Sequence, residues 1–318
     1  MLSDMKTILD DCEKHGYAIG SFNVSTIDHV LAVIDAANAE KSPALIQPIA
    51  GVTCYADEIR WWQMARECIE KYSEVPIGLH LDHGLTYDDC KRACDSGFTS
   101  VMIDASRSVV DGTANSFEKN VELTLKTVEY AHAQGVSVEG EIGTIGGGGE
   151  GATARSVNDI EYTDPAQAKL FVDCTGVDAL AIGAGTSHGT VKFPKGHQPS
   201  LAIDLIREIH SLIPQVHLVL HGSSSIGESD VDIINKYNGN VNPSSGIPDE
   251  QKVQAIAAGV RKINQGTDSH LAFTAGVREH LALSPADVDA YLYLKPGIDR
   301  MIDITRMRMR VFGSAGRA

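Results

Sequence analysis

Three histidines in this chain follow short apolar runs, and each stands directly before a glycine: His83, His188 and His221. The runs have the pattern of buried β-strands, so these histidines would lie at strand ends, where α/β barrel enzymes keep their chemistry. A lone histidine is more often a packed or surface residue. Three at matched positions predict a metal site, because imidazoles suit Zn²⁺ and a catalytic zinc keeps three protein ligands and one open position.

Carboxylates accompany these histidines. Asp82 precedes His83 and is placed to act as an acid or base on a substrate hydroxyl, or else to orient a histidine. Glu139 and Glu141 alternate along one apolar run, so they point the same way, and Asp104 ends another run. Inward carboxylates are costly unless paired or metal-bound. A bound Zn²⁺ polarises a carbonyl, so that a neighbouring carbon can lose a proton to form an enediolate.

The elements that must position these groups alternate along the chain. Eight candidate strands recur about every 35 residues, which predicts an α/β fold of the (β/α)₈ barrel type. The candidate strands are 18–24, 44–49, 77–81, 100–104, 136–142, 179–184, 217–220 and 262–264, and the helices between them are 26–40, 58–71, 86–96, 116–134, 165–175, 199–213 and 249–258. A doubly wound sheet is the alternative, but no G-x-G-x-x-G follows the first strand. We expect residues 1–318 to form one domain. An Arg-rich helical extension after residue 284 should pack across the barrel or a neighbouring subunit.

Two kinds of loop complete the pattern. Residues 143–154 hold six glycines in twelve positions, which predicts a mobile lid; a phosphate-binding loop is the weaker interpretation, since no Lys-Ser/Thr follows. The loop after His188 brings Lys192. The segments 222–224 and 264–267 follow the seventh and eighth candidate strands, where such barrels bind phosphate.

Composition excludes several classes of function. The net charge of −15 argues against nucleic acid and anionic membrane surfaces as partners, although it also fits simple solubility. The six cysteines have no disulfide-scaffold or CxxC spacing, and Cys90 and Cys94 are expected to be small buried residues rather than ligands. No leader or membrane-length apolar run is visible, so we expect a cytoplasmic protein.

Taken together, these motifs resemble the class II, zinc-dependent fructose-bisphosphate aldolase family. The resemblance runs from residue 19 to residue 316 and rests on FNV (22–24), LDHG (81–84), VMIDAS (101–106), VEGEIG (138–143), GTSHG (185–189), LHGS (220–223) and FGSAG (312–316). It implies a barrel that forms homodimers or homotetramers. It also implies reversible C3–C4 cleavage of a ketose phosphate to dihydroxyacetone phosphate and an aldehyde.

The resemblance also implies roles for individual residues. Asp82 would take the C4 hydroxyl proton, and Glu150 is the nearby carboxylate for the proton of dihydroxyacetone phosphate. The metal ligands would be His83, His188 and His221, with Glu141 and Asp104 as alternative or outer positions. Asn23 would contact the substrate. The 1-phosphate, with a monovalent cation near it, would be bound by Gly189, Lys192, Gly222, Ser224, Asn264 and Thr267.

Four departures from the family pattern concern the other end of the substrate: Ile49, Gly266, His270 and Ile298. The family usually has a polar residue, Asp, Arg and Arg at these positions. A phosphate dianion needs charge-assisted partners, which isoleucine lacks. Neighbours such as Lys295, Arg300 or Arg155 would have to compensate; otherwise the distal group is not a phosphate.

Two other kinds of protein fit parts of the pattern. A zinc hydrolase on the same barrel would want an H-x-H on the first strand, where Phe22-Asn23-Val24 stands. A non-catalytic protein that binds a metal or sugar phosphate would not need Asp82.

Overall fold

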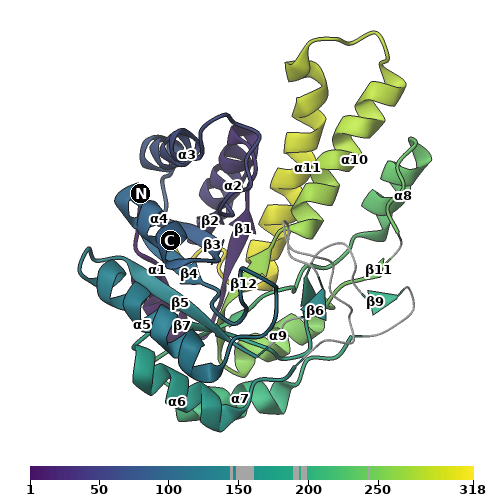
Figure 1. Cartoon of the computed structure of the whole chain (residues 1–318). Helices are drawn as coiled ribbons and strands as arrows, with labels where there is room; N and C mark the ends of the chain where they lie inside the picture. Colours follow the sequence, from purple (N-terminus) through teal and green to yellow (C-terminus); the bar gives the residue numbers. More distant parts are fainter. Residues whose placement is uncertain (144–145, 148–160, 189–192, 195–198, 243) are drawn as a thin grey trace.

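The computed structural model describes residues 1–143, 146–147, 161–188, 193–194, 199–242 and 244–318, and its centre is a closed barrel of parallel strands (Figure 1). The predicted (β/α)₈ fold is therefore confirmed. Around the barrel the strands follow the order β1-β12-β10-β7-β5-β4-β3-β2. Their bounds are β1 Ile19–Asn23, β2 Ala44–Gln47, β3 Ile77–Gly84, β4 Ser100–Ile103, β5 Ser137–Ile142, β7 Ala179–Ile182, β10 His217–Leu220 and β12 Val260–Gln265.

Helices surround the strands, because each apolar helix face packs on the outer side of the barrel. They are α2 Ile27–Glu40, α3 Glu58–Tyr72, α4 Tyr87–Asp95, α5 Phe117–His132, α6 Pro165–Thr175, α7 Ile203–Leu212, α8 Glu228–Lys236, α9 Asp249–Ala257 and α10 Thr267–Leu283. Short strand pairs join β6 Gly146–Gly147 to β8 Ser187–His188, and β9 Phe193–Pro194 to β11 Ser244–Ser245. No helix in the described part of the chain is long and apolar enough to cross a membrane.

The N-terminal helix α1 (Met5–His15) closes one end of the barrel. Its side chains Met5 and Leu9 are fully buried and form one cluster with residues from the strands, including Met102 and Val219. The predicted strands contain these inward-facing apolar residues, but no helix was predicted from the sequence to cover them. We therefore expect the functional site at the other end, where the strands carry their C-terminal residues.

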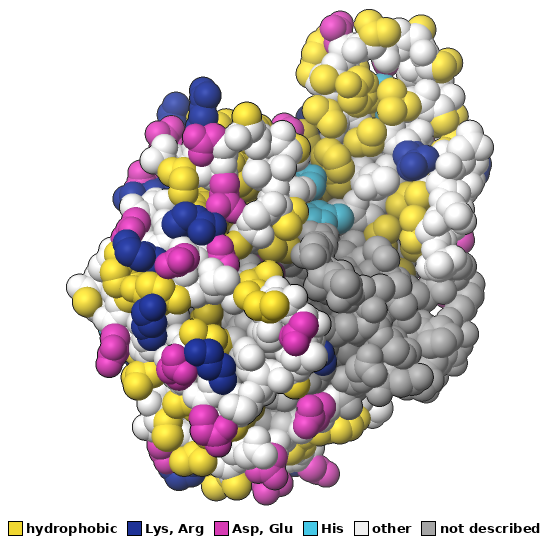
Figure 2. All heavy atoms as spheres, viewed as in Figure 1, with side chains coloured by type: hydrophobic (Ala, Val, Ile, Leu, Met, Phe, Trp, Pro, Cys, Tyr) yellow, Lys and Arg dark blue, Asp and Glu magenta, His cyan; other side chains and the backbone are white. Residues whose placement is uncertain are grey.

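The C-terminal part of the chain forms a hairpin of two long helices that projects from the barrel (Figure 1). The expected C-terminal extension is α11 (Ala290–Val311), which packs along α2 and α10 of the same chain. Pro296 interrupts its hydrogen bonding where Gly276 of α10 crosses closely; a Cβ on Gly276 would lie 2.5 Å from the Pro296 carbonyl oxygen. Figure 2 shows histidine side chains gathered where the barrel meets this hairpin.

Candidate metal and acid–base centre

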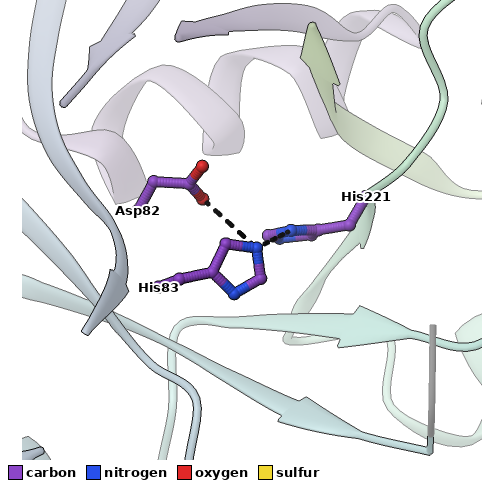
Figure 3. A group of neighbouring side chains, drawn as sticks. All are labelled: Asp82, His83 and His221. Carbon is purple, nitrogen blue, oxygen red and sulfur yellow. Dashed lines mark hydrogen bonds and ion pairs between the residues drawn. The ribbon is translucent and has the colours of Figure 1, made fainter. Parts of the chain in front are cut away.

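The end of β3 delivers two neighbouring side chains to one point. The predicted strand stopped at Leu81, but β3 continues to Gly84 with an irregular pairing between Leu81 and Gly84. His83 has a φ of 48°, a left-handed conformation that is uncommon outside glycine. In a regular strand consecutive side chains point to opposite faces. The irregularity breaks this alternation, so Asp82 and His83 both point toward His221 (Figure 3).

Two imidazole nitrogens face each other at the centre of this group. His221 directly follows β10, and its Nδ1 lies 3.2 Å from Nε2 of His83. The same Nε2 lies 4.0 Å from Oδ1 of Asp82. One ligand atom from each of the three residues lies within 4.8 Å of the others, a spacing that could hold a metal ion.

His83 also belongs to a second group that could hold a metal ion, together with Asp104 and Glu141. Nδ1 of His83 lies 3.3 Å from Oδ2 of Asp104, while Ser106 donates through its hydroxyl to the other carboxylate oxygen at 2.6 Å. The structure therefore brings together four of the five predicted metal ligands. The backbone of the fifth, His188, lies in β8, but its side chain is outside the described residues.

A buried ion pair beneath the histidines orients His221. Nε2 of His221 donates to Glu139 at 2.6 Å, and the other Glu139 oxygen lies 2.9 Å from Nζ of Lys262. Both Glu139 and Lys262 are completely buried. This contact fixes the proton on Nε2, which leaves the lone pair of Nδ1 facing His83. Sequence reasoning missed Lys262, because a lysine in an apolar strand carries no local sign of its partner.

Three side-chain amides hold Asp82. Asn23 donates to Oδ2 at 2.7 Å, Gln47 donates to the same oxygen at 3.2 Å, and Asn264 donates to Oδ1 at 3.2 Å. Asn264 also accepts from Lys262 at 2.8 Å, so the lysine supports the carboxylate as well as the histidine. Gln47 was missed by sequence reasoning. Asn264 was assigned to the phosphate by resemblance, whereas the described contacts of its amide are with this network.

The buried carboxylates of the centre favour positive charge on the groups beside them. Burial alone would raise the pKa of Asp82, but His83, His221 and Lys262 outweigh it and lower the pKa. Burial would likewise lower the pKa of His83, but Asp82, Asp104 and Glu141 raise it to about 10. Burial lowers the pKa of His221 despite the opposing effect of Glu139. A potential that holds a proton on His83 also attracts a divalent cation.

The two predicted phosphate-binding segments, 222–224 and 264–267, contact each other. The backbone N–H of Gly266 donates to Oγ of Ser224 at 3.2 Å, which joins the loop after β10 to the end of β12. Gly222 adopts a φ of 63°, a conformation that glycine permits without strain. Thr267 is the first residue of α10, so the N-terminal N–H groups of this helix open onto the same region.

Three of the four departing positions lie against Asp82 or its hydrogen-bond partner Asn23. Ile49 pairs with Asp82 through a β-bridge, and a Cβ on Gly266 would lie 2.7 Å from Oδ1 of Asn23. Nε2 of His270 lies 3.2 Å from the Asn23 carbonyl oxygen. An aspartate at position 266 could not coexist with this Asn23 conformation. Ile298 is placed on α11, where it packs against the main apolar core.

Several predicted residues lie outside the described part of the chain. They are Glu150, Gly189, Lys192 and Arg155, together with most of the glycine-rich segment predicted to be a lid. Of the other two compensating cations, Lys295 pairs with Asp299 on the exposed face of α11. Arg300 donates to Glu279 at 2.8 Å and lies 3.4 Å from Asp230.

The barrel and its histidine–carboxylate centre define the class of protein as a barrel enzyme with a candidate metal site. A family model described as fructose-bisphosphate aldolase class-II matches residues 3–317. The fructose-bisphosphate aldolase of Giardia intestinalis is 41% identical over 317 residues, covering 100% of this chain and 94% of the relative. That of Pseudomonas aeruginosa is 40% identical over 327 residues, covering 100% of this chain and 92% of the relative.

Solved structures agree with the sequence comparison. The crystal structure of the YdjI aldolase from Escherichia coli K12 aligns with a TM-score of 0.78 at 29% identity, covering 100% of both chains. The chain therefore belongs to the class II fructose-bisphosphate aldolase family and is a lyase. The predicted family and enzyme class are confirmed.

Proposed function

We propose that this protein is a metal-dependent aldolase that cleaves a ketose 1-phosphate between C3 and C4, giving dihydroxyacetone phosphate and an aldehyde. The observation that carries the proposal is the convergence of His83, His221 and Asp82 at the C-terminal mouth of the barrel. Family membership over the whole chain supports the same chemistry.

The donor set fits a zinc ion. His83 would bind through Nε2 and His221 through Nδ1, because the other nitrogen of each ring contacts a carboxylate. His188 is the proposed third ligand, and Glu141 and Asp104 are proposed alternative or outer positions. When bound, the metal supplies Lewis-acid polarisation of the substrate carbonyl.

Asp82 is the proposed base for the C4 hydroxyl. Against the effect of burial, His83, His221 and Lys262 lower the pKa of Asp82, and three amide donors hold the carboxylate beside the proposed metal ligands. Removing the hydroxyl proton allows the C3–C4 bond to break, and Glu150 is proposed to handle the proton of dihydroxyacetone phosphate.

The 1-phosphate is proposed to bind between the two joined loops. Gly222, Ser224 and Thr267 offer N–H and hydroxyl groups, and the N-terminus of α10 favours an anion. Gly189, Lys192, Asn264 and a monovalent cation are proposed additions from the family resemblance.

A second, finer candidate function is cleavage of a ketose 1-phosphate whose aldehyde half carries no phosphate. It is favoured by the residues expected at the distal end of the substrate, the end away from the 1-phosphate. Ile49, Gly266 and Ile298 carry no charge, and His270 contacts the β1 backbone. The Arg300 guanidinium is already paired with carboxylates. A zinc hydrolase is less well supported, because β1 offers no H-x-H and the family is one of aldolases.

The setting of the enzyme is also a proposal. We infer one catalytic domain, a homodimer or homotetramer, and a role in carbohydrate breakdown such as glycolysis. Cytoplasmic location is supported by the six cysteines, all of which are free thiols.

Cleavage of a panel of ketose 1-phosphates, with and without a 6-phosphate, tests the function. Exhaustive chelation should abolish cleavage, and Zn²⁺ or Co²⁺ should restore it. His83→Ala should remain inactive after metal is added, whereas His132→Ala, at an exposed position on α5, should match the wild type. Full activity of His83→Ala after chelation would overturn the proposal.

A further inference from the structure

A cluster of four charged residues, three of them buried and the fourth, Asp249, partly exposed, lies directly behind the two proposed phosphate-binding loops, and the proposed mechanism does not use it. Arg308 of α11 donates to Asp268 at 2.8 Å through Nε and to Asp249 at 2.7 Å through Nη1. Lys252 of α9 lies 3.3 Å from the same Asp249 oxygen. The side chain of Lys252 is completely buried, and those of Arg308 and Asp268 are nearly so.

The cluster is connected to both loops. Lys252 donates to Oγ of Ser225 at 2.6 Å, and Ser225 is the residue after Ser224 in the loop that follows β10. Asp268 is the residue after Thr267, in the first turn of α10. The four charges therefore tie α9 and α11 to both sides of the proposed phosphate site.

Asp268 creates an electrostatic problem that Arg308 solves. The N-terminus of a helix attracts anions because its N–H groups are unpaired and its dipole is positive there. A carboxylate in the first turn would occupy that potential and repel a phosphate dianion. The guanidinium at 2.8 Å balances this charge in a buried environment, where screening by water is weak.

We propose that Arg308 is a positioning residue for phosphate binding: it cancels the charge of Asp268 and locks the first turn of α10, so that the substrate phosphate meets N–H groups instead of an unpaired carboxylate. This inference rests on the proposed function, which assigns the phosphate to these loops. It links the C-terminal helix α11 to substrate affinity.

The test measures binding of dihydroxyacetone phosphate to the metal-loaded enzyme by calorimetry, with the metal content of each variant determined separately. Arg308→Met should weaken binding about 10- to 100-fold at unchanged metal content. Arg308→Met/Asp268→Asn should recover most of the loss. Arg310→Met is the matched control, because Arg310 lies on the same helix and pairs with Glu40 on the surface.

Asp268→Asn alone separates the electrostatic role from a structural one and leaves Arg308 paired with Asp249. It should bind dihydroxyacetone phosphate as tightly as the wild type or tighter, whereas a merely structural pair predicts weaker binding. Weaker binding by Asp268→Asn, or unchanged affinity in a folded Arg308→Met enzyme, would overturn this inference and leave the proposed function standing. A wild-type enzyme that retains metal but binds no dihydroxyacetone phosphate would overturn the proposed function as well.

Discussion

The proposed metal and base centre and the residues proposed to face the distal end of the substrate are neighbours at the mouth of the barrel, yet their side chains are arranged in opposite ways. The centre holds three buried charges that are connected to one another. Lys262 forms an ion pair with Glu139 and donates to Asn264, which in turn donates to Asp82. At the distal end, Ile49 and Gly266 offer no charge and His270 contacts the backbone of β1.

Under the proposed function, this difference separates the residues for bond breaking from the residues for recognition of the aldehyde. A buried network in which each member depends on the others tolerates little change, because removing one charge leaves another unpaired. Apolar and glycine positions beside it can vary without disturbing that balance. We therefore expect the family's chemistry to be kept and its specificity for the distal group to differ.

The largest expected effect comes from removing the base. Asp82→Ala should slow C3–C4 cleavage by ~10²–10⁴. Solvent proton exchange on dihydroxyacetone phosphate should survive, because that step needs the metal and the other carboxylate. Both rates can be followed on one preparation, with the exposed Asp88→Ala on α4 as control. Equal loss of both reactions would make Asp82 an organiser of the metal site.

The distal end is tested by substrate choice. Fructose 1,6-bisphosphate should be a poor substrate relative to a ketose 1-phosphate whose sixth carbon carries hydrogen, hydroxyl or another substituent in place of the phosphate, a sulfonate included. Two missing charged hydrogen-bond donors would lower kcat/KM by ~10²–10⁴. Introducing His270→Arg and Ile298→Arg should raise turnover of the bisphosphate selectively. A kcat/KM for the bisphosphate above that of every 6-unphosphorylated ketose would contradict this prediction.

A smaller effect is expected from the ion pair beneath His221. Glu139→Gln should weaken zinc binding by ~10–100-fold, because a neutral amide oxygen accepts more weakly from Nε2–H of His221 than the carboxylate does. Competition with a chelator of known affinity measures the change, and Glu122→Gln, exposed on α5, is the control. Unchanged zinc affinity would show that Glu139 serves only to balance Lys262.

The smallest expected effect is on stability; it is absent at neutral pH and concerns His29. The His29 ring lies 5.1 Å from that of His270 and 4.6 Å from that of Phe273. Burial, followed by the proximity of His270, lowers the pKa of His29 to about 3. Below pH 6.5 the unfolded chain takes up a proton that the folded protein refuses, so stability falls as pH decreases toward 3.

His29→Phe should therefore lose about 2 kcal/mol less of its free energy of unfolding between pH 7 and pH 5 than the wild type. Urea unfolding at the two pH values measures this difference. Parallel losses in the two proteins would show that His29 is not kept neutral by folding.

Much of the fold and of the candidate site was predictable from local sequence. Apolar runs that end in His-Gly identified the strand ends, and the alternation of strands and helices identified the barrel, since parallel strands must bring their C-terminal ends to one face. Asp82, His83, Asp104, Glu141 and His221 were predicted on these grounds and the structure joins them in two overlapping groups. The family resemblance supplied the expected reaction and the expected roles of individual residues, which spacing alone left open.

Other features were decided only by the tertiary structure. Helices α8 and α10 escaped prediction, and α10 buries the polar Asp268 and Ser269 because partners from other elements surround it. Gln47, Lys262 and Arg308 took their roles from residues 35 to 123 positions away in the chain. The irregular end of β3, which turns Asp82 and His83 to the same side, likewise depends on its pairing with β4. A hydrogen bond or ion pair between distant segments leaves no periodic trace in either one, so only the folded chain decides which polar residues meet.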